Sequence, residues 1–450
     1  MTRSATSVLA LTVWGMVCPV SMVFAEPGLE TSLTVSQGVK SVNRTGRTSS
    51  EKEGVSSTTS LDFGLTSTTA SQRFDVKVGT ELDYGLGASS GNDFSAARKD
   101  ASLGYSIESR TARFKTDLSY RNVDIEDSVF LDELTGKDVV ADNGRRELLG
   151  LTSSLMLGRD TPLSFELDHS YQESSYTDTT DSDLLDSTST RASAALSFEL
   201  SPVLTLEARS SYSDYSEDGP LGDQLTTRTN GIGATYQLSP GTSVSAEVNY
   251  SSSTTEDPAD DSSGVGYNLS LSHDMPNGSV EVALSAANTV NGTRNQVSLG
   301  RSLEFGWGKA SLSVGASQTG DFSVRPLVNG TLHYAVDKLS ALDVNLSQTS
   351  FTGSDNDEIV RTQLSVGYQR ELTDSSRLSS SLQLSDRTVL GSSNSDQSVM
   401  RMDLSYAHEV GADWSLVSGY QYSKVDEQIK EDRTDSTVFL KLEKTFAFRP

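Results

Sequence analysis

The sequence predicts an all-β fold, a transmembrane antiparallel up-and-down β-barrel of about 22 strands within a range of about 18 to 24. Three observations predict it: two-residue hydrophobic alternation, two kinds of connection in strict alternation, and aromatic residues at strand ends. The stretch RFDVKVGTELDY, residues 73–84, places charged side chains on one parity and apolar side chains on the other. Such a strand lies between two different environments.

The first 25 residues predict a secretory signal peptide. Arg3 supplies the basic start, Val8–Met22 forms the apolar stretch, and cleavage is expected after Ala25. Cys18, the only cysteine, lies inside this segment, so neither disulfides nor thiolate metal sites are expected in the mature chain. No other segment has the roughly 18 consecutive apolar residues that a membrane helix needs. Sec-type export to a Gram-negative periplasm, outer membrane or exterior is therefore expected.

Alternating segments of about 9 to 13 residues recur along the whole mature chain, and about 22 of them can be recognised. Short turns such as those at 68–71, 201–202 and 411–413 alternate with longer polar connections such as 85–97 and 122–144. Short turns at one end and long loops at the other describe a membrane barrel with periplasmic turns and extracellular loops. A solenoid would instead repeat a unit of fixed length, and no such repeat appears.

Aromatic side chains on the apolar parity gather near both ends of the predicted strands. Two such rings are what the two interfaces of a bilayer select, whereas the general β-propensity of tyrosine would not cluster them by strand end. The predicted membrane-interface aromatics are Tyr84, Tyr105, Tyr120, Tyr171, Tyr212, Tyr236, Tyr250, Tyr368, Tyr406, Trp414 and Tyr420.

The opposite parity carries charges of both signs and is predicted to line a hydrated interior. Cross-strand ion pairs are expected there, and stabilisation of the wall is favoured over a defined ligand site. The predicted lumen-lining residues are Arg73, Asp75, Lys77, Glu81, Asp83, Arg113, Lys115, Asp117, Arg121, Glu166, Asp168, Glu207, Arg209, Arg361, Arg401 and Asp403.

Residues 26–450 as a whole resemble Gram-negative outer-membrane β-barrel proteins, on their architecture, their aromatic rings and their TFAF terminus. Phe446 and Phe448 resemble the terminal-strand insertion signal, although Arg449 and Pro450 follow. The resemblance implies a single barrel domain, contact with lipid and lipopolysaccharide, and the outer-membrane barrel insertion machinery as a partner. More loosely, the chain is similar to porin-like barrels associated with exopolysaccharide secretion.

A plug domain is not expected, because residues 26–28 alone separate the predicted signal from the first strand. Energised uptake is disfavoured for that reason, and so wide a barrel needs something else to narrow it. The longest loop, 122–144, is the best internal candidate, with an apolar cluster among seven acids. Folding into the lumen, capping the rim and packing on itself remain open. The constriction candidates are Asp127, Val129, Phe130, Leu131, Asp132, Glu133 and Leu134.

Four long loops concentrate the negative charge. Loops 122–144, 172–190, 213–226 and 251–264 carry a net charge of −19, out of −26 once the signal peptide and its single base are removed. Such loops favour cations near the mouth, and nucleic acid is a poor partner for so acidic a chain. The run DPADDSSG lacks the ligand spacing of a calcium loop, so no metal site is assigned.

Catalysis is not expected, and no cofactor is implied. The histidines are His169, His273, His333 and His408, of which His333 alone has the parity to face the lumen. No long loop contains histidine or cysteine, so a surface hydrolase would lack its usual acid-base group.

Three functions fit these features. The first is an outer-membrane channel for passive passage of polar solutes, with a preference for cations. The second is an export conduit for an exopolysaccharide or another polymer with a periplasmic partner, which in one variant plugs the lumen. The third is a structural or adhesive surface barrel.

Overall fold

The computed structural model describes residues 28–46, 52–86, 94–126, 129–131, 138–141, 143–181, 184–219, 224–256, 261–353, 357–390, 396–411, 413–427 and 431–448. Its strands are β1 (Gly28–Gly46), β2 (Lys52–Thr68), β3 (Gln72–Gly85), β4 (Phe94–Glu108), β5 (Ala112–Asp124), β6 (Val129–Leu131), β7 (Asp138–Val140), β8 (Arg145–Leu157), β9 (Leu163–Thr177), β10 (Ser187–Ser201), β11 (Leu204–Glu217), β12 (Gln224–Ser239), β13 (Thr242–Thr255), β14 (Ser262–Met275), β15 (Gly278–Thr289), β16 (Gly292–Phe305), β17 (Gly308–Thr319), β18 (Arg325–Asp337), β19 (Ser340–Thr352), β20 (Glu358–Thr373), β21 (Ser376–Leu390), β22 (Gln397–Glu409), β23 (Trp414–Glu427) and β24 (Arg433–Phe448).

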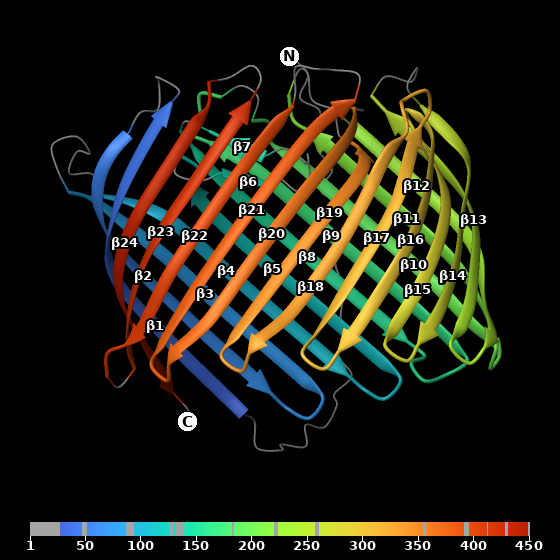
Figure 1. Ribbon diagram of the computed structural model, residues 1–450, viewed down its shortest axis with the longest axis horizontal. Coiled ribbons are helices and arrows are strands. Elements are labelled where there is room, and N and C mark those ends of the chain that lie inside the picture. Colours follow the sequence, from blue (N-terminus) through green and yellow to red (C-terminus); the bar gives the residue numbers. More distant parts are fainter. Residues whose placement is uncertain are drawn as a thin grey trace, which may run out of the picture.

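Twenty-two strands form one closed antiparallel sheet in which each strand pairs with its neighbours in sequence. β1 pairs with β2 on one side and with β24 on the other, with Leu33 opposite Phe446, so first and last strands close the barrel. Figure 1 shows the inclined strands of the near wall in front of oppositely inclined strands of the far wall. The predicted fold class and strand number are confirmed, and each predicted segment corresponds to one barrel strand.

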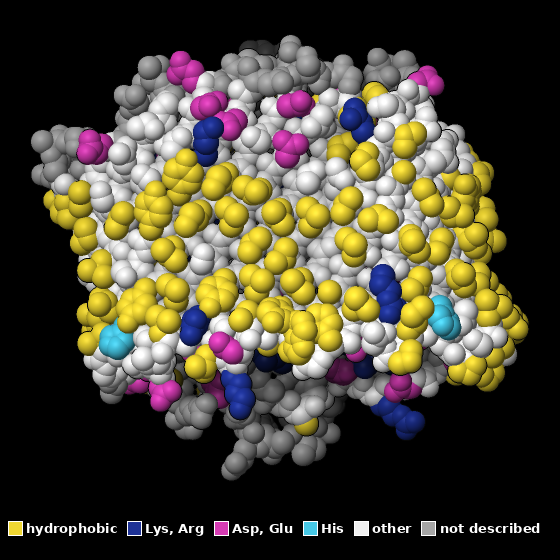
Figure 2. Space-filling view, viewed as in Figure 1, with side chains coloured by type: hydrophobic (Ala, Val, Ile, Leu, Met, Phe, Trp, Pro, Cys, Tyr) yellow, Lys and Arg dark blue, Asp and Glu magenta, His cyan; other side chains and the backbone are white. Residues whose placement is uncertain are grey.

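Every second residue of each strand points outward, and many of these outward residues are apolar. The outer face of the barrel is therefore apolar. Figure 2 shows a broad hydrophobic belt on one side of the molecule, with charged side chains gathered near its margins. Leu61, Val78, Leu118 and Ile232 are examples of outward residues that the protein itself leaves exposed. Among the described residues, no helix is long and apolar enough to cross a membrane.

Tight turns connect neighbouring strands at one end of the barrel. Gly158 illustrates the backbone that they require, with φ of 77° and a position where an added Cβ would lie 2.1 Å from the carbonyl oxygen of Leu163. Only glycine adopts such a conformation at little cost. At the opposite end several strands continue beyond the predicted segments, and the connection between β5 and β8 contains the two-stranded sheet of β6 and β7.

Candidate functional site

The inner face of the barrel is polar and charged. The strand register places every predicted lumen residue on this face and every predicted interface aromatic on the outer face. Thus Asp75 is opposite Gly104 and then Asp117, while Phe74 is opposite Tyr105. Phe446 and Phe448 lie on the outer face of β24, opposite Leu33 and Thr31. These positions establish which way the residues face, and their functional roles remain predictions.

Many inner-face ion pairs join residues two apart on one strand rather than residues on neighbouring strands, which differs from the expected cross-strand pairing. Arg73 lies 2.6 Å from Asp75, and the pairs Lys115–Asp117 (2.8 Å), Arg209–Glu207 (2.6 Å) and Lys441–Glu443 (3.6 Å) have the same spacing. Residues i and i+2 share one face of a strand, so long side chains reach each other along it. Ser, Thr and Gly at many of the facing positions leave no charge to pair with across the strands.

Two further ion pairs cross an intervening strand. Lys40 on β1 contacts Asp83 on β3 at 2.5 Å, and Arg98 on β4 contacts Asp62 on β2 at 2.6 Å. The Arg98–Asp62 ion pair lies over Gly79 on β3, where an added Cβ would lie 2.6 Å from a carboxylate oxygen of Asp62. A small residue on the middle strand therefore makes room for an ion pair over it.

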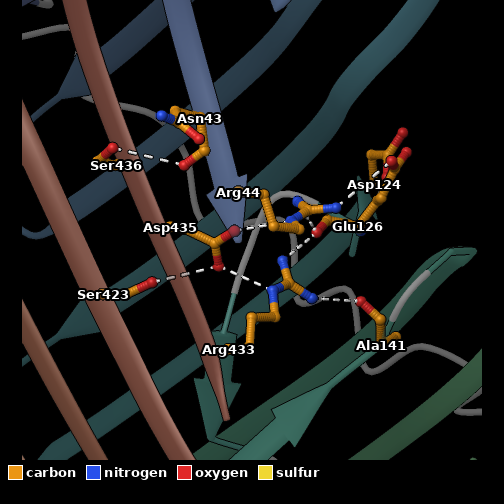
Figure 3. A network of polar contacts seen from close by, with 9 residues as sticks. All are labelled: Asn43, Arg44, Asp124, Glu126, Ala141, Ser423, Arg433, Asp435 and Ser436. Atoms are coloured by element: carbon orange, nitrogen blue, oxygen red, sulfur yellow. Dashed lines mark hydrogen bonds and ion pairs between the residues drawn. The ribbon is translucent and has the colours of Figure 1, made fainter. Parts of the chain in front are cut away.

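A buried polar network lies on the inner face of the β1–β24 seam (Figure 3). Asp435 accepts hydrogen bonds from Nε of Arg44 at 2.7 Å and from Nε of Arg433 at 2.8 Å. Arg44 and Arg433 are 2% and 0% exposed. Charges so deeply buried need partners on all sides, and the carboxylate between the two guanidinium groups supplies one of them.

The same two arginines hold the connection between β5 and β8 against the seam. Each donates a hydrogen bond to the carbonyl oxygen of Glu126, and Arg433 also donates to the carbonyl oxygen of Ala141 at 2.7 Å. β2, β3 and β4 separate the seam from β5, so Glu126 and Ala141 meet the seam on the inner side of the barrel. We call the described residues of this connection, 125–126, 129–131 and 138–141, the interior segment.

Apolar burial accompanies these hydrogen bonds. Ile125 and Ala141, the two ends of the interior segment, are both 0% exposed. Arg433 is paired in register with Val425 on β23, and Val425 with Val399 on β22. These two valines face inward and are nearly fully buried, whereas apolar residues on the outer face are widely exposed. A small apolar core therefore exists inside the barrel, at its long-loop end.

Of the predicted constriction residues, Val129, Phe130 and Leu131 form β6, which pairs with β7. Asp127, Asp132, Glu133 and Leu134 lie outside the described residues. The residues that fix the interior segment, Glu126 and the seam network, were not among the sequence candidates. A signal for them was present in the sequence, since Arg44 and Arg433 carry inward parity on the two strands that a closed barrel must bring together.

Charge is distributed unevenly around the inner wall. Arg361, Arg387 and Arg401 lie on β20, β21 and β22, and the first two are paired in register. With Arg44 and Arg433 they extend the basic arc to β24 and β1, near the long-loop ends of these strands. The four acidic loops instead connect strands between β5 and β14. The acidic loop 122–144 nonetheless reaches this basic arc, where the carbonyl oxygen of Glu126 accepts hydrogen bonds from Arg44 and Arg433.

The wall across β11–β18 is hollowed and lined mostly by small polar residues. A cavity of about 470 Å³ lies there, with Glu207, Arg209, Glu247, Asn268 and Gln296 among its lining residues. Glycines at positions such as 231 and 233 contribute no side chain. This part of the wall is open, in contrast to the covered arc at the seam.

The remaining features of the inner wall are one lumen-facing histidine and the groups that could bind a metal ion. His333 faces the lumen and its Nδ1 lies 2.6 Å from a carboxylate oxygen of Asp343, with both side chains at least half exposed. Within the described ranges, no group of three or more His, Cys, Asp or Glu residues could hold a metal ion.

No protein-family model matches the sequence, and no curated protein sequence matches it. Solved receptor structures match nearly the whole chain. The ferric enterobactin receptor PfeA of Pseudomonas aeruginosa has a TM-score of 0.56 at 10% identity, covering 92% of this chain and 81% of the receptor. BauA, the ferric preacinetobactin receptor of Acinetobacter baumannii, has a TM-score of 0.55 at 10% identity, with coverage of 92% and 80%.

The ferric-catecholate import receptor Fiu of E. coli K12 is similar to the same degree, with a TM-score of 0.56 at 8% identity and coverage of 91% and 81%. The fold is therefore that of a Gram-negative outer-membrane β-barrel with 22 strands, structurally like the barrels of TonB-dependent siderophore receptors. At this identity the likeness concerns the fold.

Proposed function

We propose that this protein forms a water-filled channel in the outer membrane for passive passage of polar solutes, with a preference for cations. The observation that carries the proposal is the interior segment, bound to the seam by Arg44 and Arg433 at the long-loop end. A barrel of this size is too wide to leave open. A segment fixed inside the lumen narrows the path while leaving the polar wall of β11–β18 accessible to water.

The wall supports this function in two ways. Its outer belt is apolar and suits lipid, and its closure leaves no unpaired strand edge in the membrane. The inner wall carries charged and hydroxyl side chains, which can form hydrogen bonds with a polar solute in place of those that the solute forms with bulk water. The four acidic loops, at −19, lower the potential at the mouth and draw in cations over roughly 8 Å at physiological ionic strength.

Planar-bilayer recordings on the purified mature protein test the proposal. We expect steady single-channel steps and a reversal potential, under a salt gradient, that shows cation preference. A correctly folded barrel that gives no steps contradicts the passive channel. Steps with anion preference contradict the role given to the acidic loops. Migration on a gel before and after heating verifies that the barrel is folded.

A second candidate is a conduit whose lumen is filled by a partner. The strand number favours it, because 22-stranded outer-membrane transporters have a plugged lumen. The structurally similar proteins include a ferric preacinetobactin receptor and a ferric-catecholate import receptor. Purification from the native membrane distinguishes the two candidates. A stoichiometric periplasmic protein that copurifies with the barrel, and that abolishes conductance when added back, favours the second.

A further inference from the structure

The hollow in the inner wall across β11–β18 contains a row of polar residues at one level of the barrel. The strand register carries this row across six neighbouring strands, β11 to β16, because each member is paired with the next. The members line the cavity of about 470 Å³, a volume within the usual range of ligand sites. From β11 to β16 they are Glu207, Gly233, Glu247, Asn268, Ser285 and Gln296.

The two carboxylates of this row differ in their partners. Glu207 lies 2.6 Å from Nη2 of Arg209 on its own strand. Glu247 accepts a hydrogen bond at 3.4 Å from the amide of Asn249, a neutral group, and no base among the described residues forms an ion pair with it. Two acids and one base line the hollow, so its net charge is −1. The charge of Glu247 is therefore the one available to a ligand.

The space beside Glu247 comes from two glycines on β12. Gly233 is paired with both Glu207 and Glu247 and puts no side chain between them. At Gly231 an added Cβ would lie 2.9 Å from Oε1 of Glu247, so a larger residue there would displace the carboxylate. The two glycines therefore leave room for a ligand group against the carboxylate.

Neutral hydrogen-bonding groups follow Glu247 on its other side. Neighbouring strands are about 4.8 Å apart, so Asn268 lies roughly 5 Å and Ser285 roughly 10 Å along the row from Glu247. The amide of Asn268 and the hydroxyl of Ser285 can donate and accept, as the hydroxyl groups of a sugar do. A carboxylate binds an ammonium group through a charge-assisted hydrogen bond. A small solute with an ammonium group at one end and hydroxyl groups along its body uses all three side chains.

Other ligand classes fit less well. An anionic solute would meet the Glu247 carboxylate, and the guanidinium group in the lining, Arg209, is already paired with Glu207. The lining includes no aromatic side chain, so an aromatic solute would find no ring to stack on. A metal ion would lack a second carboxylate close by, because Glu207 and Glu247 are two strands apart, about 10 Å.

The geometry points to a binding site for a protonated, hydroxylated amine, that is, an amino sugar, at Glu247, Asn268 and Ser285 on the lumen wall. The inference rests on the proposed channel, which gives the ligand access, and it names the solute class that the channel favours. The acidic loops at the mouth and the carboxylate on the wall both act on a cationic solute, so the site agrees with the cation preference.

Calorimetry on the folded barrel in slightly acidic detergent buffer, with glucosamine, N-acetylglucosamine and glucose as probes, tests the site independently of conductance. The amine of glucosamine is protonated under these conditions, whereas the other two sugars are neutral. We expect glucosamine to bind at least about tenfold more tightly than either neutral sugar, because it alone forms the charge-assisted hydrogen bond with Glu247. Equal binding of the three probes would overturn the site.

Glu247→Gln should weaken the binding of glucosamine by at least about tenfold, with the binding of glucose unchanged. Glu281→Gln is the matched control, because Glu281 also faces the lumen, on β15, but lies outside the lining of the hollow. Both substitutions remove one negative charge from the same wall. An equal loss in the two variants would assign the effect to the overall charge of the lumen and would overturn the site.

Asn268→Ala tests the part of the site that contacts hydroxyl groups. It should weaken the binding of glucosamine and of glucose by the same factor, and unchanged binding of both would overturn the assignment to a sugar. A silent bilayer recording with the preference for glucosamine intact would refute the channel and leave the site standing. Steady steps together with equal binding of the three probes would refute the site and leave the channel standing.

Discussion

Arg44 and Arg433 donate hydrogen bonds to the same acceptor, the carbonyl oxygen of Glu126. The two arginines belong to the first and last strands of the barrel, and Asp435 binds both of them. The closure of the barrel and the position of the interior segment therefore share one network. The seam must form before the segment has its anchor, so the constriction depends on completed closure.

Replacing Arg433 should release the interior segment. In Arg433→Gln the carbonyl groups of Glu126 and Ala141 lose a charged donor, and we expect single-channel steps to become larger and noisier. Since the guanidinium is fully buried and ion-paired, we also expect the free energy of unfolding to fall by about 3 kcal/mol. Conductance recordings and urea unfolding in detergent measure the two effects.

Lys441→Gln is the control for that variant. Lys441 faces the lumen on the same strand, but it is 39% exposed and its contact with Glu443 is 3.6 Å long. A pair of this kind contributes about 0–1 kcal/mol. If both variants leave the steps unchanged, the arginine anchor does not set the width of the pore.

Removing Asp435 should cost more than removing either arginine. Asp435→Asn leaves Arg44 and Arg433 facing each other without the carboxylate that separates their charges. We expect the barrel to lose about 3–5 kcal/mol of unfolding free energy. In the double variant with Arg433→Gln the two costs should not add, with a coupling of about 0.5–3 kcal/mol. Strict additivity in urea unfolding would show that the network does not act as a unit.

A glycine under an aromatic ring provides a test near the same seam. Phe439 on β24 lies inside the barrel over Gly419 on β23, where an added Cβ would be 2.4 Å from the ring and 2.8 Å from the carbonyl oxygen of Leu404. Gly419→Ala should therefore destabilise the barrel by about 1–3 kcal/mol. Urea unfolding of the variant in detergent measures this.

Gly367→Ala is the matched control, because its nearest neighbour, Cβ of Asp343, would be at 3.9 Å. Alanine there should be neutral or slightly stabilising, since a strand glycine is costly in conformational entropy. Adding Phe439→Leu to Gly419→Ala should recover part of the loss. Equal stability of the two alanine variants would refute the clash.

The fold was predictable because lipid and water impose different residues on alternate positions of every strand. Where the strands rise above the lipid this constraint disappears, and the alternation weakens. β1 continues to Gly46, beyond the stretch in which apolar and polar residues alternate. Arg44 lies in that part of the strand, where only its parity indicates that it faces inward.

The inward path of the loop could not be derived for a related reason. An apolar cluster in a polar loop predicts burial, but it does not say against which surface. The buried apolar residues inside the barrel come from single inward positions on separate strands, such as Val399 on β22 and Val425 on β23. Only the closed register of the barrel brings them together.

A buried ion pair at the long-loop end is a further stability test. Glu358, 1% exposed, accepts hydrogen bonds from Nη2 of Arg294 at 2.7 Å, from Thr319 at 2.9 Å and from Ser350 at 2.5 Å. These contacts link β16, β17, β19 and β20. They lie at the end of the wall where β18 and β19 are not paired, since the pairing of these two strands includes β18 only from Gly330 onward. Glu358→Gln should lower the unfolding free energy by about 3–5 kcal/mol, because it leaves a buried cation without its counter-ion.

The comparison variant is Glu371→Gln, at the other end of the same strand. Glu371 is half exposed and lies 3.7 Å from Arg377, a contact that contributes about 0–1 kcal/mol. Thermal unfolding in detergent should separate the two variants clearly. Similar melting temperatures would mean that the ion pair does not hold this part of the wall.

The most direct test of the account is the conductance of a variant that lacks the interior segment. Deleting residues 125–141 leaves Asp142-Asn143-Gly144 between Asp124 and Arg145, which are paired in register and can be closed by a three-residue hairpin. A control deletion of residues 257–260 shortens another long loop. We predict larger single-channel steps for the first deletion alone. Steps of unchanged size in a folded barrel would contradict the claim that the interior segment narrows the pore.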